Sequence, residues 1–440
     1  MARFATALTT IAFILLAVAA PGQAGDRWTI IHAGRVLDVP GGRPRGKTSI
    51  IIKNERILAL RKGFITGAPD ASAKDASAKN PQIIDWSDKF VLPGLIDSHV
   101  HITVEISPHI RLDEVTLYDA DRAFDAAVYA RRTLAAGFTT VRDLGSRGYA
   151  AFALRNAIKA GKLPGPRLLV AGDMISPLGG HGDMTGYREG VFPGPLPNTC
   201  SGVADCRRAV RYEIKRGADV IKLSATGGVL SPIATGTEQE FFPDELRALV
   251  ETGHLMGKRV SAHAHGTNGI KAALRAGVDS IEHGTFLDDE AIALFHDTGA
   301  WLVPTMLAGA TVAKMAEIKG YFPPAIRDKA RRVGPQMRDT VRRAYQAGVK
   351  IAFGTDSGVS KHGQNARELA LMVAAGMPPA AVLKAATVNA SQLLNRAQDI
   401  GTLEPGKYAD LIATDGDPLE DITVLSGALA VMKGGVLYQP

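Results

Sequence analysis

The chain has 440 residues and a formal net charge of +7, with 46% hydrophobic and 22% charged residues. This composition is typical of a soluble globular protein, and the length allows one large barrel or two to three domains. Aromatic residues make up only 6% of the chain and the basic residues are dispersed. We therefore expect no nucleic-acid partner, because neither a stacking platform nor a basic patch is evident.

The first 24 residues differ from the rest of the chain. Arg3 is their only charge, residues 7–20 (ALTTIAFILLAVAA) are apolar, and small residues precede a cleavage point after Ala24. This pattern predicts a secretory signal peptide over residues 1–24, because so short an apolar run spans a bilayer poorly as an anchor. We expect a secreted or periplasmic protein with no membrane contact after cleavage.

Short β-like stretches follow the signal peptide and return at the end of the chain. The first two are residues 28–38 (WTIIHAGRVLD) and 49–60 (SIIIKNERILAL). The simplest packing joins residues 25–88 and 400–440 into one small β-domain, a β-sandwich built from both ends of the chain.

Between these ends, over residues 89–399, the pattern alternates strand and helix. The predicted strands are residues 95–102, 139–144, 167–172, 219–225, 259–265, 280–284, 301–305 and 350–356. Several intervening helices end at a glycine, as at Gly137, Gly277 and Gly299, which suits the left-handed position after a helix. Eight strand-then-helix units predict an α/β fold, a (β/α)8 TIM barrel. A doubly wound open sheet is the alternative.

Polar side chains recur at the ends of the predicted strands, where barrel enzymes place their active sites. His99 and His101 are separated by one residue, so both point to the same side of their strand. The full set is His99, His101, Lys222, His263, His265, His283 and Asp356. Imidazoles that converge with a carboxylate and a lysine indicate a two-metal site.

Lys222 lies in an otherwise apolar strand, VIKLSATGG. A buried ammonium beside metal cations would be repelled and poorly solvated. Loss of the proton and reaction with carbon dioxide would give a carbamate, an anion that can bridge two cations. The alternative is an ion pair between Lys222 and a nearby acid such as Glu282.

Five motifs in order resemble the amidohydrolase superfamily: PGLIDSHVH, VIKLSATGG, SAHAHG, SIEHGTF and FGTDSG. They are most similar to its imidazolonepropionase-like and Xaa-Pro dipeptidase branch, which includes secreted enzymes that cleave ochratoxin-type N-acyl amino acids. The resemblance covers roughly residues 85–440. It implies a barrel, a flanking β-domain and two divalent metal ions, for which Zn²⁺ suits imidazole and carboxylate ligands.

The resemblance also implies a role for each residue of the predicted site. One metal would be held by His99, His101 and Asp356. The second would be held by His263 and His283, which are 20 residues apart as in the family, and carboxylated Lys222 (N6-carboxylysine) would bridge the two. His265 is then left as a substrate contact, with a loop hydrogen bond as the alternative.

The expected chemistry is attack on an amide by a metal-activated hydroxide. Asp356 would orient the hydroxide, take its proton and pass it to the leaving nitrogen. His181, in the loop PLGGHGDMTG, is similar to a family histidine that faces the substrate and would aid the oxyanion or bind a carboxylate. A turn histidine in solvent is its alternative role.

We expect the substrate to carry a free carboxylate, as an Xaa-Pro-type dipeptide or an N-acyl amino acid does, ochratoxin-like amides included. The alternatives are a cyclic-amide hydrolase of the imidazolonepropionase type and a non-catalytic exported binding protein. We also expect a homo-oligomer. Cys200 and Cys206, the only cysteines, could form a disulfide in an oxidising compartment or remain unpaired thiols.

Overall fold

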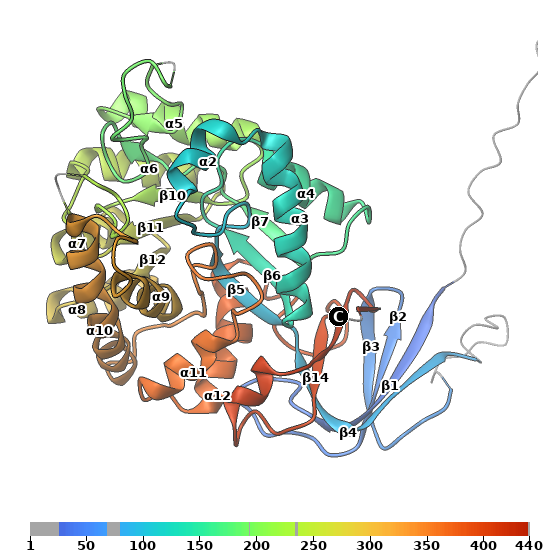
Figure 1. Ribbon diagram of the computed structural model, residues 1–440. Helices are drawn as coiled ribbons and strands as arrows, with labels where there is room; N and C mark the ends of the chain where they lie inside the picture. Colours follow the sequence, from blue (N-terminus) through green and yellow to red (C-terminus); the bar gives the residue numbers. More distant parts are fainter. Residues whose placement is uncertain (1–25, 68–79, 193, 234–235, 439–440) are drawn as a thin grey trace, which may run out of the picture.

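The computed structural model describes residues 26–67, 80–192, 194–233 and 236–438. The predicted signal peptide, residues 1–24, lies outside the described residues. Within them, no helix is long and apolar enough to cross a membrane. A ring of strands and helices carries most of the chain, and a sheet that contains both the early and the late strands lies at its side (Figure 1).

The sheet at the side of the ring has seven strands in the order β16-β15-β14-β4-β1-β2-β3. They are β1 (Trp28–Val36), β2 (Thr48–Lys53), β3 (Arg56–Lys62), β4 (Gln82–Pro93), β14 (Leu411–Thr414), β15 (Ala430–Lys433) and β16 (Val436–Tyr438). The β-branched run of β2, TSIIIK, favours this extended conformation.

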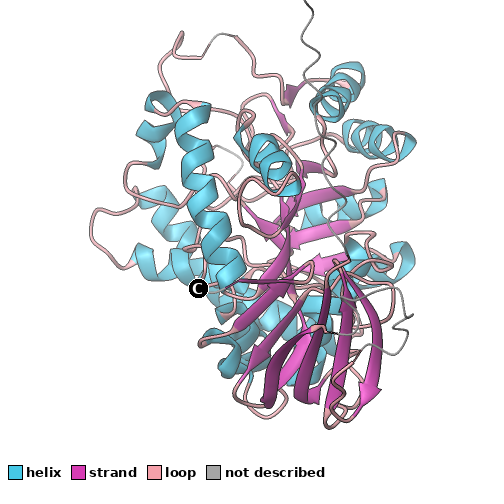
Figure 2. Cartoon of the chain, turned by 90° about the vertical axis from the view of Figure 1, so that its right-hand side faces the viewer, coloured by secondary structure: helices cyan, strands magenta, loops and turns pink. Residues whose placement is uncertain are grey.

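The two ends of the chain meet where β14 pairs with β4 in antiparallel register, with Ile412 opposite Leu92. The hydrogen-bonded ladder is therefore continuous through all seven strands (Figure 2). β4 is long enough to pair with β1 along one part and with β14 along another, so strands from both ends of the chain share one sheet. Side chains of this sheet form a cluster of buried hydrophobic residues, among them Ile31, Trp86 and Leu411.

Seven of the eight predicted barrel strands are strands in the structure, and they form two parallel sheets. The first contains β5 (Leu95–Val100), β6 (Phe138–Asp143) and β7 (Arg167–Val170). The second contains β10 (Ile221–Ser224), β11 (Val260–Ala264), β12 (Ser280–His283) and β13 (Trp301–Val303). Two short strands, β8 (Ser176–Pro177) and β9 (Thr199–Cys200), pair outside these sheets.

Backbone hydrogen bonds connect the two sheets at both edges. At one edge the Asp219 N–H donates to the Val170 carbonyl over 2.8 Å. At the other edge the segment 350–356 lies between β13 and β5: the Ala352 N–H donates to the Leu302 carbonyl over 3.0 Å, and the Ser98 N–H donates to the Phe353 carbonyl over 2.9 Å. The ladder thus returns from the last strand position to the first and closes a ring.

The eighth predicted strand, residues 350–356, is not a regular strand, because it forms only single bridges such as Ile351 with Leu302. Its backbone passes very close to its neighbours at Gly354. A Cβ at this position would lie 2.4 Å from Val303 Cγ1 and 3.0 Å from His99 Cβ. The segment therefore closes the ring where only a glycine fits.

Helices follow most strands and cover the outside of the ring (Figure 1). They are α2 (Ile110–Thr116), α3 (Asp119–Ala135), α4 (Ala150–Lys159), α5 (Val203–Arg216), α6 (Pro243–Leu255), α7 (Thr267–Ala276), α8 (Asp289–Thr298), α9 (Met306–Ala316), α10 (Pro324–Gln346), α11 (Arg367–Ala374), α12 (Pro379–Lys384) and α13 (Ala390–Leu393). A π-helix spans Ala385–Asn389 and a 3-10 helix spans Ile422–Ser426. Gly277 and Gly299 adopt the predicted left-handed conformation after α7 and α8.

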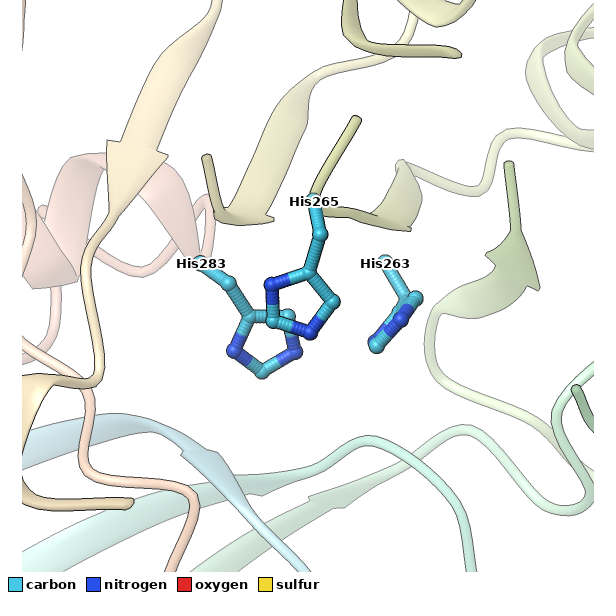
Figure 3. Close-up of side chains that lie close together, drawn as sticks. All are labelled: His263, His265 and His283. Atoms are coloured by element: carbon cyan, nitrogen blue, oxygen red, sulfur yellow. The ribbon is translucent and has the colours of Figure 1, made fainter. Parts of the chain in front are cut away.

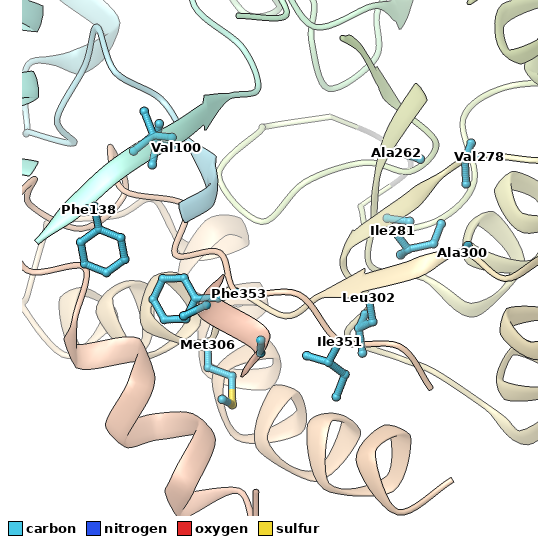
Figure 4. Close-up of a cluster of buried hydrophobic side chains, with 14 of the residues drawn as sticks. Val100, Phe138, Ala262, Val278, Ile281, Ala300, Leu302, Met306, Ile351 and Phe353 are labelled. Carbon is cyan, nitrogen blue, oxygen red and sulfur yellow. The ribbon is translucent and has the colours of Figure 1, made fainter. Parts of the chain in front are cut away.

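The core lies between the ring and its helices, and its members come from strands that are distant in sequence. Figure 4 shows Phe138 of β6 next to Phe353, and Ile281 of β12 near Leu302 of β13. The two phenylalanine rings stack with centroids 5.4 Å apart. Cys200 and Cys206 form a disulfide that links β9 to the first turns of α5, so the paired alternative for these cysteines is the one observed.

Candidate active site

The first cluster joins the end of β5 to the ring-closing segment. Nε2 of His101 lies 3.2 Å from Oδ1 of Asp356, and Nε2 of His99 lies 3.6 Å from the same oxygen. His99 and Asp356 are buried, whereas the His101 side chain is 24% exposed. The three ligand atoms lie within 4.8 Å of one another, which is close enough for one metal ion.

The second cluster comes from the ends of β11 and β12. His263, His265 and His283 place ring nitrogens within 4.8 Å of one another, and their rings gather around one point (Figure 3). His265 stacks on His283 with ring centroids 4.8 Å apart. His265 therefore lies about as close to the two predicted ligands, His263 and His283, as these lie to each other.

Lys222 lies beside these clusters on β10. Its Nζ is 3.4 Å from Nε2 of His99, and burial lowers its pKa to about 8, because desolvation disfavours the ammonium. No ion pair joins Lys222 to Glu282. Glu282 is occupied by Arg142, whose Nη2 lies 3.0 Å away, and by Nδ1 of His99 at 2.9 Å.

Four of the five histidines in the two clusters are held through Nδ1, His263 being the exception. Nδ1 of His101 donates to the Gly145 carbonyl over 2.6 Å, and Nδ1 of His283 lies 2.7 Å from the Thr305 hydroxyl. A carbonyl can only accept, so His101 must carry its proton on Nδ1 when neutral, and Nε2 is left with a lone pair. This is the arrangement that fixes metal-binding histidines in proteins.

The backbone is strained at the mouth of the ring. Among the described residues, five that are not glycine have positive φ angles, and two of these are the asparagines Asn54 and Asn395. The other three are His283 (φ 70°), Thr305 (φ 51°) and Asp356 (φ 57°). A left-handed conformation is unusual for such residues and is found most often at functional sites.

A cavity of about 340 Å³ opens onto both clusters, and Lys222 and His181 also line it. His181 packs against His263 with ring centroids 4.3 Å apart, and its Nδ1 makes a hydrogen bond to Ser231. A Cβ at Gly228 would lie only 2.2 Å from the His181 ring. His181 thus faces the cavity, and burial lowers its pKa to about 3.

Comparison with known proteins identifies the family of the chain. Residues 90–437 match the model of the amidohydrolase family. The chain belongs to this family. Ochratoxinase from Aspergillus niger is 32% identical to this amidohydrolase over 438 residues, which cover 93% of this chain and 86% of that protein.

Solved structures of other amidohydrolases are similar over nearly the whole chain. A Xaa-Pro dipeptidase with bound methionine in its active site is 42% identical, with a TM-score of 0.87 and coverage of 94% of this chain and 100% of that one. A prolidase complexed with N-methylphosphonate-L-proline is 31% identical, with a TM-score of 0.83 and coverage of 94% and 99%. The predicted resemblance is confirmed, and this amidohydrolase is a hydrolase that acts on carbon–nitrogen bonds.

The donor atoms of the first cluster fit a metal ion, which members of this family usually require. Oδ1 of Asp356 is buried and has no hydrogen-bond partner among the described residues. It faces Nε2 of His101, the nitrogen that carries a lone pair in the neutral ring. A cation between these two acceptors would satisfy both.

The sequence did not reveal the support behind the first cluster. Besides His99 and Arg142, the buried carboxylate of Glu282 accepts hydrogen bonds of 2.6 Å from Ser261 and from Ser280. Burial alone would raise the pKa of Glu282, but Arg142 and His99 together hold it below its ordinary value. Strand alternation does not indicate this role, because the left-handed backbone of His283 (φ 70°) interrupts it, and Glu282 and His283 both lie against His99.

Proposed function

We propose that this amidohydrolase is an exported binuclear metal enzyme on a (β/α)8 barrel. It cleaves an amide bond in a substrate that bears a free carboxylate, either an Xaa-Pro-type dipeptide or an N-acyl amino acid. The observation that carries the proposal is the meeting of two three-residue clusters and Lys222 at one cavity. We further expect a homo-oligomer.

The ligands of the two ions follow the two clusters. One ion would be held by His99, His101 and Asp356, and the second by His263 and His283, with carboxylated Lys222 between them. Two divalent ions, in our proposal Zn²⁺, would supply the positive charge that acidifies water and polarises the amide carbonyl. Lys222 is suited to carboxylation because its lowered pKa makes a reactive neutral amine accessible near pH 8.

Asp356 performs the proton transfers in this proposal. Burial raises its pKa, but His99 and His101 outweigh this effect and keep the pKa below its ordinary value, so the carboxylate is ionised at neutral pH. It accepts a proton from the attacking water and donates that proton to the leaving nitrogen.

Two further histidines face the substrate in this proposal. His181 and His265, with pKa values lowered by burial to about 3 and about 4, are neutral at pH 7. His265 engages Thr285 through Nδ1 at 2.7 Å, which leaves its Nε2 for the substrate. His181 would bind the carbonyl oxygen or the carboxylate of the substrate.

The relatives favour this substrate class over the alternatives. The similar proteins are named as a Xaa-Pro dipeptidase, a prolidase and an ochratoxinase, and the prolidase structure contains an L-proline derivative. A cyclic-amide hydrolase fits the predicted export less well, since the breakdown of histidine belongs in the cytoplasm. A non-catalytic binding protein would have no need for the complete set of ligands.

A substrate panel tests the proposal directly. Protein loaded with Zn²⁺ and protein treated with a chelator are assayed with methionyl-proline, N-benzoyl-L-phenylalanine and a cyclic imide. We expect hydrolysis of at least one of the first two compounds, and loss of that hydrolysis after chelation. Hydrolysis of the cyclic imide alone would contradict the substrate class, and equal activity without metal would contradict the metal centre.

A further inference from the structure

The lining of the active-site cavity is not uniform. One part is apolar and comes from α9, α10 and the segment 229–232, with Val312, Val333, Met337 and Leu230 among its members. Another part is charged and contains Arg111 and Glu114 of α2 and Arg147 of the loop after β6. A ligand that fills the cavity therefore meets an apolar surface and a charged surface.

Arg147 lies beside two loops that position residues of the site. It follows Gly145 by two residues, and the Gly145 carbonyl holds His101 of the first cluster. Nη2 of Arg147 donates to the Gly182 carbonyl over 3.2 Å, and Gly182 is the residue after His181. Arg147 thus belongs to the loop that positions His101, and its guanidinium contacts the loop that carries His181.

The charge of Arg147 is only partly compensated. Its Nε lies 3.4 Å from Oε2 of Glu114, and the same oxygen is 3.2 Å from Nη2 of Arg122. Two arginines therefore share one carboxylate. The Arg147 side chain is 30% exposed, and its Nη1 makes no hydrogen bond to the described residues, so Nη1 can still donate to an anionic group.

Arg111 and Asp183, two other charged residues that line the cavity, each have contacts of their own. Arg111 donates to the Thr185 carbonyl over 2.9 Å and stacks on the Tyr187 ring at 4.5 Å. Asp183 accepts from the backbone N–H groups of Gly179 and Met184 over 2.8 Å and 2.7 Å. Among the described residues, Arg111 also keeps unused donors at Nε and Nη1, so Arg147 is distinguished by its place beside the loops of Gly145 and Gly182.

We propose that Arg147 binds the free carboxylate of the substrate and so sets the direction in which the substrate lies in the cavity. The carboxylate half lies against the loops that carry Gly145 and Gly182, and the acyl half lies against the apolar surface of α9 and α10. A planar guanidinium recognises a carboxylate through paired hydrogen bonds, which a lysine cannot reproduce. This inference rests on the proposed function and adds the residue that selects the carboxylate.

A pair of substrates that differ only in the carboxylate tests this role. Release of benzoate is measured from N-benzoyl-L-phenylalanine and from its neutral analogue N-benzoyl-L-phenylalaninamide, with wild-type, Arg147→Met and Arg147→Lys proteins. For the acid we expect kcat/KM to fall about 10- to 100-fold in Arg147→Met, mainly through KM, because a charge-assisted hydrogen bond is lost. For the amide we expect a change of less than about threefold.

Two further variants make the result specific. Arg188→Met removes an exposed arginine that does not line the cavity and lies in the segment between β8 and β9, which also carries Gly182. This variant should turn over both substrates normally. Glu114→Gln removes the competing carboxylate and should lower KM for the acid by about two- to fivefold. Arg147→Lys should recover only a small part of the loss for the acid.

Equal losses for the acid and the amide in Arg147→Met would show a bracing role and overturn the inference, as would an unchanged KM for the acid. Binding of both compounds, measured by calorimetry, separates this failure from failure of the proposed function. If wild-type protein cleaves neither compound, binding alone tests the role of Arg147, and the substrate panel tests the proposed function separately. Arg147→Met must weaken binding of the acid at least about tenfold more than binding of the amide, and a smaller difference overturns it.

Discussion

The two clusters that could each hold a metal ion are supported in different ways. Behind the first cluster, His99 rests on the buried Glu282–Arg142 ion pair, and the cluster itself contains the carboxylate of Asp356. The second cluster consists of three imidazoles, of which His265 and His283 are held by threonine hydroxyls. One cluster therefore brings its own negative charge, whereas the other is neutral.

This difference suggests an order of metal affinity. A cation gains more from a carboxylate, and from a histidine made more basic by an acid, than from neutral imidazoles. The second cluster needs an anion from elsewhere, and carboxylated Lys222 would supply it. We therefore expect a chelator to remove the ion of the second cluster first.

Removal of Lys222 should have the largest effect. Lys222→Ala deletes the anion on which the second cluster depends, and we expect kcat/KM to fall at least about 1,000-fold, because metal ions contribute several kcal/mol to such reactions. Metal analysis should show selective loss of one of the two ions. Lys215→Ala, at an exposed position of α5, is the control and should change neither activity nor metal content. Normal activity of Lys222→Ala would refute the bridging role.

Substitution of Asp356 should reduce turnover more than binding. Asp356→Asn keeps an oxygen ligand but removes the proton acceptor, so we expect kcat to fall about 100-fold or more with KM changed little. Steady-state kinetics at several pH values, together with metal analysis, provide the measurement. A variant with near-normal kcat and two bound ions would contradict the proton-transfer role of Asp356.

The supports behind the clusters should contribute unequally. Glu282→Gln removes the negative charge next to His99, and we expect metal affinity at the first cluster to fall about 10- to 100-fold. Thr305→Val removes only a neutral partner of His283, so its effect should be smaller, at about tenfold or less. Competition with a chelator measures both. Equal losses of metal affinity in the two variants would show that the charged partner of His99 and the neutral partner of His283 contribute alike.

Protonation should produce the smallest effect. In His265 the pKa is lowered from 6.5 to about 4 because the ring is buried, so below pH 6.5 the unfolded chain binds a proton that the folded chain does not. Stability is then lost as the pH falls from 6.5 towards 4. Burial raises the pKa values of Glu213 and Glu368 to about 8. These two groups change stability with pH in the opposite direction, so the contribution of His265 is measured by comparing two proteins.

Chelated wild-type and His265→Gln proteins provide that comparison. Between pH 7.5 and pH 5.5 the wild type should lose roughly 1 kcal/mol more unfolding free energy than the variant, because it alone carries this titrating group. Denaturant unfolding at both pH values gives the difference. The same loss in both proteins would mean that His265 titrates normally.

The parts of the molecule that could be predicted are those marked by a residue pattern within a short stretch of sequence. The strand pattern placed seven barrel strands, and spacing within motifs placed His99 and His101 on one face. The segment 350–356 was harder, because its irregular path depends on the close approach of Gly354 to Val303 and His99. The continuous seven-stranded sheet depends on the pairing of β4 with β14, which no local pattern records.

The missed parts of the site depend on contacts between distant strands. Arg142 and Glu282 are 140 residues apart, and neither side chain indicates its partner in the sequence. Thr305 supports His283 through an unusual left-handed backbone that a threonine does not predict. Arg147 lies in a loop without periodicity, so only the folded structure places it in the cavity with His101 and His181.

Anomalous diffraction data recorded at the zinc edge from crystals of the protein show directly whether two ions are bound at the proposed positions. We expect two anomalous peaks per chain, one beside His99, His101 and Asp356 and one beside His263 and His283, with a carbamate on Lys222 between them. A single peak, or an unmodified Lys222 that makes an ion pair with Glu282, would contradict this expectation.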